Sequence, residues 1–453
     1  MVKNKIEKQV LDRITPDKEY KERVNKTINE IKKEIKKEIT ERDLPVKIEL
    51  VGSTAKDTYL KDSLDIDFFI LFPTKFPKEK IGKKAISIGK KILKDTEESY
   101  AEHPYLRGYY KNFKIEIVPC YKIEKASQKL SAVDRTPLHT KYVKKHLREK
   151  QKQEVRLFKQ FLKGIGCYGA EAEVEGFSGY LCEILVLYYK SFNNIVKNAE
   201  KWKQGIKLML CNYKHPDFDT PLIFIDPVDS NRNVASALSK DKFGLFIKAC
   251  KEYLKKPSVT FFFPKPIKQW SIEKISSEIK KQNCRYIAIK IAKPKIITEN
   301  LYPQLRKAVR SIWKASEIND FNVYDAVFHV EKNIILIIIK TEIKPLSKTI
   351  IHTGPPTKLK KHVKEFINKW KEDPRVTKKP YEKNNRLYVE IEREHTKIKD
   401  FLKHEIKKLS LGKHIDEIVK NNYEIIDLKD FLNDEQRVFW TGYLDKKMPW
   451  RRK

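Results

Sequence analysis

Two aspartates placed directly before a run of apolar residues give the strongest constraint on how this chain folds. Asp65 and Asp67 flank Ile66 and lead straight into three apolar residues, and Pro73 bounds the segment. Because side chains alternate along a strand, Asp65 and Asp67 share one face while Ile66 points the other way. Asp65–Phe72 is therefore expected to be a strand with one acidic edge and one face that other elements cover.

A third acid stands in a similar setting further along the chain. Glu116 lies in an apolar segment, Phe113–Val118, which is expected to be a second strand that Pro119 ends. If the two strands are neighbours, the carboxylates of Asp65, Asp67 and Glu116 converge on one sheet face. Clustered carboxylates repel unless a cation neutralises them, and Mg²⁺ prefers oxygen ligands and phosphates. The three residues are therefore predicted to bind Mg²⁺ and to catalyse an in-line phosphoryl displacement.

A turn before the acidic strand predicts a phosphate contact. A strand is expected over Val46–Val51, followed by the pair Gly52 and Ser53 and a loop or short helix. Glycine lets backbone amides approach a phosphate closely, and the Ser53 hydroxyl adds a donor. Lys56 is placed to pair with a triphosphate oxygen.

The remaining periodicity predicts an α+β multidomain chain with three parts, at 1–145, 146–260 and 261–453. The first part combines strands with covering helices, including residues 1–45 and Lys83–Leu93. The second is mostly helical, with helices over Glu154–Ile165, Gly179–Phe192 and Phe243–Leu254.

The third part is expected to contain half of a ferredoxin-like or RRM-like sheet. Its strand, helix and hairpin are predicted at Tyr286–Ile291, Leu305–Ile318, Val323–Val330 and Ile334–Ile339, with Lys340 beginning a more polar stretch. Basic helices at Lys358–Trp370 and Thr396–Leu409 and a strand at Leu387–Glu392 follow.

The charge of the chain indicates a polyanionic partner. Its 453 residues carry a formal charge of +35. Nucleic acid is the first candidate, and an anionic membrane surface is the second. The chain has no apolar run long enough to span a membrane and no secretory signal. Its six cysteines are dispersed, so reduced thiols in the cytoplasm are expected.

Longer stretches of the sequence resemble one particular family. The Gly-Ser turn, the spaced Asp-x-Asp and a later acid resemble the DNA polymerase β-like nucleotidyltransferase superfamily. Further strings resemble the archaeal, class I CCA-adding enzymes, which are tRNA nucleotidyltransferases. These strings are Ala101-Glu102-His103-Pro104-Tyr105, Val118-Pro119-Cys120-Tyr121, Ala132-Val133-Asp134-Arg135-Thr136-Pro137, Gly176-Phe177-Ser178-Gly179-Tyr180, Asp226-Pro227-Val228-Asp229, Arg232-Asn233-Val234-Ala235 and Asn300-Leu301-Tyr302-Pro303-Gln304-Leu305.

The resemblance implies addition of C, C and A to the 3′ end of tRNA from CTP and ATP without a nucleic-acid template. Asp65, Asp67 and Glu116 match the family's metal-binding carboxylates, although the third is commonly Asp. The positions that match triphosphate-binding or other nucleotide-contacting residues are Ser53, Lys56, His139, Lys159 and Tyr168. Lys56 stands where some relatives carry Arg, and Lys keeps the charge without the bidentate fork. Arg232 matches the base-selecting arginine.

Other interpretations of these residues stay open from the sequence alone. His139 is also explained as a surface histidine, Lys159 as a lysine snorkelling from a helix, and Tyr168 as a core aromatic. Arg232 is one of 96 basic residues. The alternative functions are a poly(A) polymerase or other terminal transferase, and a non-catalytic RNA-binding protein.

The basic C-terminal region is expected to contact tRNA phosphates without reading sequence. The residues concerned are Lys358, Lys360, Lys361, Lys364 and Lys369 and the tail Arg451-Arg452-Lys453. The oligomeric state is left open, and a homodimer is one alternative.

Overall fold

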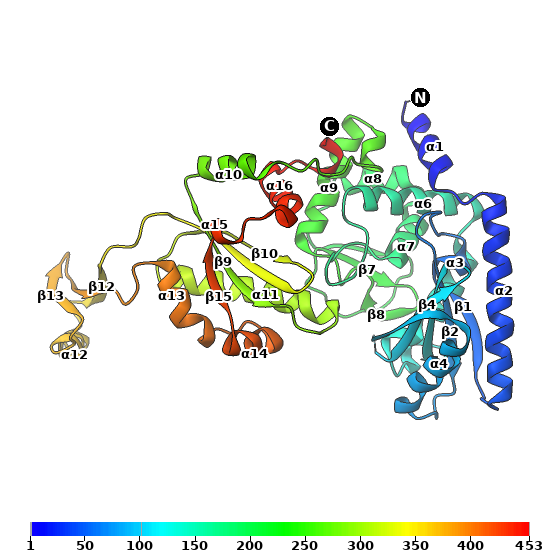
Figure 1. Ribbon diagram of the computed structural model, residues 1–453, viewed down its shortest axis with the longest axis horizontal. Helices are drawn as coiled ribbons and strands as arrows, with labels where there is room; N and C mark the ends of the chain where they lie inside the picture. The colour runs from blue at the N-terminus through cyan, green and yellow to red at the C-terminus, as the bar shows by residue number, and fades with distance from the viewer. Residues whose placement is uncertain (1, 101, 453) are drawn as a thin grey trace. The chain divides into compact units, whose positions relative to one another are not determined.

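The structure, a computed structural model, describes residues 2–100 and 102–452, so Lys453 of the predicted basic tail lies outside the described residues. The chain divides into two compact units. Unit 1 comprises Met1–Pro266 with Lys447–Lys453, and unit 2 comprises Ile267–Lys446. Both units mix helices and strands, which confirms the α+β multidomain class (Figure 1). None of the described helices has the length and apolarity that a bilayer crossing requires.

The first sheet of unit 1 carries the predicted acidic strand. Its strand order is β1-β2-β5-β4-β3, in which β2 and β5 run parallel and the other neighbours run antiparallel. The strands are β1 (Lys47–Val51), β2 (Asp65–Phe72), β3 (Lys94–Tyr100), β4 (Pro104–Tyr110) and β5 (Phe113–Tyr121). The expected strands at β1, β2 and β5 are confirmed, whereas β3 and β4 were not predicted.

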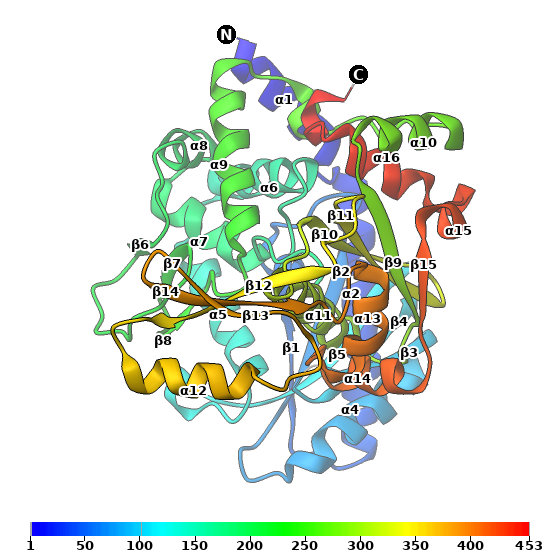
Figure 2. The same cartoon turned by 90° about the vertical axis from the view of Figure 1, so that its left-hand side faces the viewer.

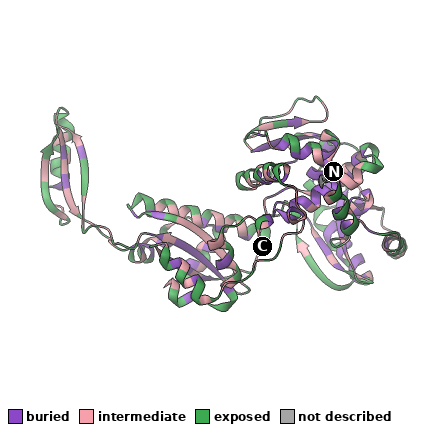
Figure 3. Cartoon of the chain, turned by 90° about the horizontal axis from the view of Figure 1, so that it is seen from above, coloured by how far each residue is buried: buried purple, intermediate pink, exposed green. Residues whose placement is uncertain are grey.

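Helices α2 (Lys18–Glu41) and α4 (Lys78–Ile92) cover one face of this sheet (Figure 1). Ile31 of α2 and Ile66 of β2 are fully buried in the same core. The alternation along β2 therefore turns its aspartates to the opposite face, as the sequence predicts. Figure 3 shows the resulting pattern, with buried residues on the strands and exposed residues on the outer surfaces of the helices.

Strand β5 does not end at Pro119, as the sequence analysis expected. It continues to Tyr121, and Pro119 lies opposite Ile70 of β2. The pairing of β5 with β4 stops at Ile117, so Pro119 has a strand neighbour on only one side. A proline is tolerated there because its missing N–H has no ladder partner to satisfy.

The remainder of unit 1 is a helical region with one large core, as expected. Phe158 of α6, Leu185 of α7 and Phe246 of α9 are all fully buried in it. The helices are α1 (Val2–Ile14), α3 (Gly52–Lys56), α5 (Thr136–His146), α6 (Glu149–Gly164), α7 (Gly179–Tyr189), α8 (Phe192–Ala199) and α9 (Lys240–Lys255).

The single helix expected over Gly179–Phe192 is two helices. Lys190 ends α7 in the left-handed conformation with φ 72°. The Ser191 hydroxyl then accepts a hydrogen bond from the Asn194 amide and caps α8. An N-terminal serine cap satisfies a helix donor that would otherwise be unpaired, so the apolar run is divided at this point.

A three-stranded sheet in the helical region was not predicted. Its strand order is β6-β7-β8, with bounds Ile206–Met209, Leu222–Asp226 and Asp229–Asn233. Strands β7 and β8 are antiparallel and form a tight hairpin. The hairpin carries both Asp226 and Arg232.

The main sheet of unit 2 has the strand order β10-β11-β9-β15. The strands are β9 (Arg285–Ala292), β10 (Val323–Val330), β11 (Ile334–Thr341) and β15 (Glu424–Asp427), and α11 (Thr298–Ile318) connects β9 to β10. The expected β-α-β-β order is confirmed. Strand β11 extends two residues beyond the expected end, because Lys340 and Thr341 still pair with Tyr286 and Arg285 of β9.

Helices cover both faces of this sheet. One core includes residues of α11, α13 (Ile398–Glu405) and α14 (Lys413–Asn421), and the other includes residues of α10 (Ile272–Lys281), α15 (Leu428–Phe431) and α16 (Arg437–Asp445). The helix expected over Thr396–Leu409 is shorter, as α13, and is followed by a 3₁₀ turn at Ile406–Lys408.

A second sheet of unit 2 has the strand order β12-β14-β13. Its bounds are Thr349–Pro356 for β12, Val376–Lys383 for β13 and Arg386–Glu392 for β14. Helix α12 (Lys360–Trp370) runs alongside these strands (Figure 2). The His352 ring of β12 stacks on Phe366 and also contacts Trp370 of this helix.

The end of the chain packs into unit 1. The ring of Trp450 stacks on Phe261 with 5.2 Å between centroids, and its Nε1 donates to Glu252 at 2.7 Å. Arg451 also pairs with Glu252. Residues 267–446 therefore form an insertion between two segments of unit 1. The boundaries expected at 145/146 and 260/261 stay a prediction.

Candidate active site

The sheet of unit 1 brings the three predicted carboxylates together. Asp67 of β2 lies opposite Glu116 of β5 in the parallel register, and Asp65 precedes Asp67 on the same face. Burial, together with the charges of Glu116 and Asp65, raises the pKa of Asp67 to about 7. The site therefore concentrates negative charge where a cation would relieve it.

Two of the carboxylates are held by basic side chains of the same sheet. Arg107 Nε donates to Glu116 Oε1 at 2.7 Å, and Lys114 Nζ lies 3.1 Å from Asp65 Oδ1. Among the residues that the structure describes, Asp67 has no ion pair, and no group of three or more His, Cys, Asp or Glu side chains is arranged so that it could hold a metal ion. The donor set is all oxygen, which suits a hard divalent cation.

Gly52 is required where the turn meets the acidic strand. Its φ of +71° is left-handed, and a Cβ atom there would lie 2.0 Å from Asp67 Oδ2. Only glycine permits both the conformation and the approach. The Thr54 hydroxyl donates to the backbone carbonyl of Asp65 at 2.7 Å, so α3 and its residue Ser53 are fixed beside the carboxylates.

Lys56 and Lys159 meet at a buried carboxylate that the sequence analysis did not single out. Lys56 Nζ lies 2.5 Å from Glu183 Oε2, and Lys159 Nζ lies 3.5 Å from Oε1. The Thr58 hydroxyl donates to Glu183 at 2.6 Å. Burial opposes ionisation of Glu183, but the two ammonium groups outweigh it and hold its pKa below the usual value. Burial lowers the pKa of Lys159.

Tyr168 joins the same cluster. A Cβ atom at Gly179 would lie 3.2 Å from the Tyr168 hydroxyl and 3.7 Å from Lys159 Nζ, so both polar groups reach the beginning of α7. Burial raises the pKa of the Tyr168 hydroxyl, which therefore stays protonated as a hydrogen-bond donor.

His139 and Arg232 meet at a second buried carboxylate, Asp226. His139 Nε2 lies 2.8 Å and Arg232 Nη1 2.9 Å from Asp226 Oδ2. The Tyr180 hydroxyl donates to the other carboxylate oxygen at 3.1 Å, and the Tyr180 ring stacks on His139. Burial opposes ionisation of Asp226, but His139 and Arg232 bring its pKa to about 2. Burial lowers the pKa of His139, and the charges of Arg232 and Lys56 lower it further.

Glu183 and Asp226 are the residues of this region that sequence reasoning missed. Glu183 is the only charged residue of α7, whose other positions are apolar or aromatic except Gly179 and Cys182. A lone acid in a buried helix requires a cationic partner, and this signal was available in the sequence. Asp226 lies in the string Asp226-Pro227-Val228-Asp229, which resembles the family, but the sequence assigned no role to it.

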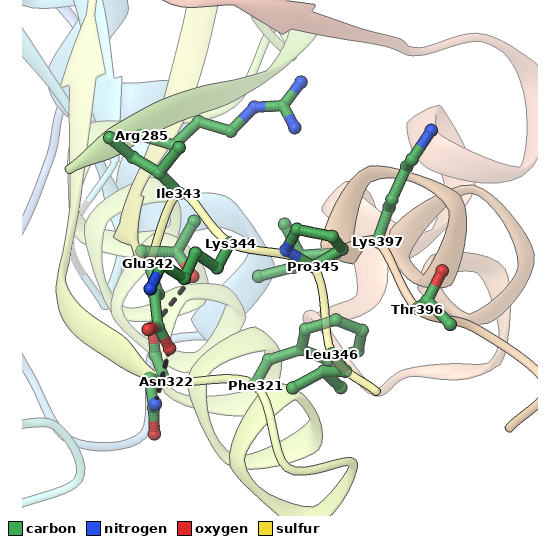
Figure 4. Close-up of a pocket in the computed structure, with 12 residues that line it drawn as sticks. Arg285, Phe321, Asn322, Glu342, Ile343, Lys344, Pro345, Leu346, Thr396 and Lys397 are labelled. Atoms are coloured by element: carbon green, nitrogen blue, oxygen red, sulfur yellow. Dashed lines mark hydrogen bonds between the residues drawn. The ribbon is translucent and has the colours of Figure 1, made fainter. Parts of the chain in front are cut away.

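A cavity in unit 2 is separate from these residues. It has a volume of about 240 Å³ and is lined by residues including Arg285, Phe321, Lys344 and Lys397 (Figure 4). None of the nine predicted site residues lines it, and all nine belong to unit 1.

Comparisons with known proteins agree with the division of the chain into units 1 and 2. Sequence models of three domain families match: the nucleotidyltransferase domain at residues 32–139, the second domain of tRNA nucleotidyltransferase at 153–263, and the C-terminal domain of the CCA-adding enzyme at 283–427. The CCA-adding enzyme of Methanocaldococcus jannaschii is 35% identical over 441 residues, which cover 93% of this chain and 95% of that enzyme. The chain belongs to the CCA-adding enzyme family.

Two further CCA-adding enzymes support this membership. That of Archaeoglobus fulgidus is 36% identical and covers 85% of this chain and 87% of its own length. That of Picrophilus torridus is 38% identical over 92% of this chain and 94% of its own length. The family resemblance drawn from the motifs is therefore confirmed, while the roles of the individual site residues remain predictions.

Proposed function

We propose that this protein is a CCA tRNA nucleotidyltransferase that adds C, C and A to the 3′ end of tRNA from CTP and ATP. The observation that carries the proposal is the register that sets Asp67 beside Glu116 and on the same face as Asp65, in a chain that matches CCA-adding enzymes over most of its length. The non-catalytic alternative would predict a lost carboxylate. The full-length relatives give the poly(A) polymerase alternative no support.

The reaction joins the RNA 3′ oxygen to the α-phosphorus of the nucleotide. The bond from the α-phosphorus to the oxygen that bridges to the β-phosphate breaks, and pyrophosphate leaves with that oxygen. The RNA 3′ hydroxyl releases its proton to the solvent. Asp65, Asp67 and Glu116 would hold Mg²⁺, which supplies charge neutralisation at the transferring phosphate. Ser53 beside the Gly52 turn would donate to the triphosphate.

The two buried carboxylates position the nucleotide-binding cations. Glu183 fixes Lys56 and Lys159, so both ammonium groups are ordered before the triphosphate binds. Tyr168 would add a neutral donor beside Lys159. Glu183 accepts from one N–H of Lys56, so the other N–H groups of Lys56 are available to phosphate oxygens. Lys159 also donates to the carbonyl and hydroxyl oxygens of Thr58, at 3.1 and 3.2 Å, so a phosphate would have to replace one of these partners.

Arg232 is the proposed base-selecting residue, and Asp226 orients it. Cytosine and adenine present an exocyclic amine beside an acceptor ring nitrogen, whereas uracil and guanine present a carbonyl and a ring N–H. A guanidinium is donor-only, so it satisfies the acceptor nitrogen and opposes a ring N–H. Asp226 binds one Arg232 nitrogen and leaves the others for the base.

Incorporation of labelled nucleotides tests the function directly. A tRNA transcript lacking CCA is incubated with Mg²⁺ and each labelled nucleotide, singly and in the CTP and ATP pair. The expected product gains three nucleotides and no more. Long homopolymer tails would favour the poly(A) polymerase, and no incorporation would favour the RNA-binding protein.

A cytoplasmic location and a homodimer also remain predictions. Sedimentation measures the oligomeric state.

A further inference from the structure

A groove of about 550 Å³ in unit 1 adjoins the acidic strand without containing any predicted site residue. Its walls come from α2, the loop before β2 and the turn between β4 and β5. The lining residues are mainly basic and aromatic, namely Tyr20, Arg23, Lys26, Thr27, Lys61, Asp62, Leu64, Tyr109, Lys111, Asn112, Phe113 and Lys114. Five of the twelve carry positive charge and one, Asp62, carries negative charge.

The five basic side chains differ in how they are held. Three are anchored by acids outside the lining: Lys61 by Asp17 at 2.8 Å, Lys111 by Glu30 at 2.7 Å and Lys114 by Asp65 at 3.1 Å. Within the described part of the chain, Arg23 and Lys26 form no ion pair, and both are exposed one turn apart on α2. The groove therefore combines ordered ammonium groups with two exposed cations that form no ion pair within the described residues.

An aromatic side chain is also available to a ligand. Tyr109 is 48% exposed, although β4 lies between β3 and β5 within the sheet. The next turn has left-handed residues at Lys111 and Asn112, with φ of 47° and 66°. The conformation is that of a two-residue hairpin, and Tyr109 and Lys111 both line the groove. Aromatic rings beside lysines are the usual surface for bases and phosphates of a single strand.

The location of the groove relates it to the reacting end of the RNA. Lys114 lines the groove and also contacts Asp65, the first residue of β2. The groove therefore opens next to the start of this strand. The predicted triphosphate contacts lie at the other aspartate, because a Cβ atom at Gly52, the residue before Ser53, would lie 2.0 Å from Asp67 Oδ2. An in-line displacement needs the attacking hydroxyl on the side opposite the leaving pyrophosphate.

We propose that this groove binds the RNA strand that carries the 3′ hydroxyl, with Arg23 and Lys26 on its phosphates and Tyr109 stacked on an unpaired base. This proposal rests on the proposed function. It assigns to unit 1 a contact with the polynucleotide, distinct from the nucleotide site and from the basic helices of unit 2.

Two double variants of the full-length protein test the phosphate contacts. R23Q/K26Q removes the two unpaired charges, and K33Q/K36Q removes two exposed charges at the same spacing on α2 outside the groove. Binding of tRNA lacking CCA is measured over a series of salt concentrations. R23Q/K26Q should weaken binding about ten- to a hundredfold near 0.1 M salt and reduce the slope of log affinity against log salt by about 1.5–2. K33Q/K36Q should change both far less.

The variant Tyr109→Leu separates stacking from charge. It should weaken binding about tenfold when the 3′ nucleotides are unpaired and leave the salt slope unchanged. With tRNA whose 3′ nucleotides are paired to a complementary oligonucleotide, the loss should disappear. Thermal unfolding and circular dichroism of each variant establish that unit 1 is folded.

The outcomes distinguish this inference from the proposed function. If the wild-type protein extends tRNA and R23Q/K26Q binds it like K33Q/K36Q, the groove inference is wrong and the function stands. A raised KM for CTP with unchanged tRNA affinity would make the groove a nucleotide site and also overturn the inference. If the wild-type protein does not extend tRNA, the proposed function fails first.

Discussion

Replacing Glu183 by glutamine should separate charge from shape at the buried cluster that holds Lys56 and Lys159. Glutamine keeps the size of the side chain and an oxygen acceptor, but it removes the carboxylate that both ammonium groups contact. Glu183 is fully buried, and Lys56 and Lys159 are 8% and 2% exposed. The variant therefore leaves two like charges in a medium that solvates them poorly.

The expected loss of stability follows from breaking a buried ion pair. Removing one partner of such a pair costs about 3–5 kcal/mol, because the remaining charge is left uncompensated. For a unit of this size, that cost lowers the unfolding midpoint by about 6–20 °C. The KM for CTP and ATP should rise, since one lysine is expected to lose its proton and its hold on the triphosphate.

The matched control is Thr58→Val, which changes no charge but removes the hydroxyl that donates to Glu183 and accepts from Lys159. It should cost about 1 kcal/mol. Calorimetry and steady-state kinetics on both variants give the comparison. If Glu183→Gln unfolds within a degree or two of Thr58→Val, with unchanged KM, then charge is not what stabilises the cluster and the reasoning is wrong.

Three further changes test the remainder of the site. Asp67→Asn should abolish incorporation yet stabilise the metal-free protein at pH 8. Folding raises the pKa of the Asp67 carboxyl from 3.8 to about 7, so the carboxyl destabilises the fold increasingly as the pH rises from about 4 to 7, by up to about 4 kcal/mol. Chemical denaturation in EDTA at pH 5 and 8 measures this, and equal stability at pH 8 would contradict it. Gly52→Ala places a methyl group 2.0 Å from Asp67 Oδ2 in a left-handed conformation, so it should lose at least a hundredfold in kcat while remaining folded; near-normal turnover would refute the close approach. Arg232→Ala should lower kcat/KM for CTP and ATP about ten- to a hundredfold while affecting UTP and GTP less, and a uniform decrease across the four nucleotides would exclude base selection.

The acidic edge was predictable because it depends on short-range rules. Asp65 and Asp67 share a face through the period of a strand, and Glu116 follows the same rule on β5. The sequence did not determine which strand would lie beside the strand of Glu116. Two short buried strands in one layer can, however, be placed in only a few orders within a sheet. The extension of β5 past Pro119 was missed because the tolerance for proline depends on a neighbour that pairs only as far as Ile117.

The two buried carboxylates depend on contacts across long stretches of chain. Glu183 is 127 residues from Lys56, and Asp226 is 87 residues from His139. Periodicity within a window cannot relate such residues, so His139, Lys159 and Arg232 could only be assigned through resemblance to a family. Their common feature, a carboxylate that orients each cation, became visible only in three dimensions.

The return of Trp450 to the core of unit 1 has a consequence for the order in which the protein matures. Phe261, its stacking partner, emerges from the ribosome long before it, and residues 267–446 must be synthesised in between. Domains usually fold as units while synthesis proceeds, the N-terminal one first. Here unit 1 stays incomplete until residues 447–453 have been synthesised, so unit 2 can fold before unit 1 is complete. Truncation after Lys446 would therefore damage the unit that was made first.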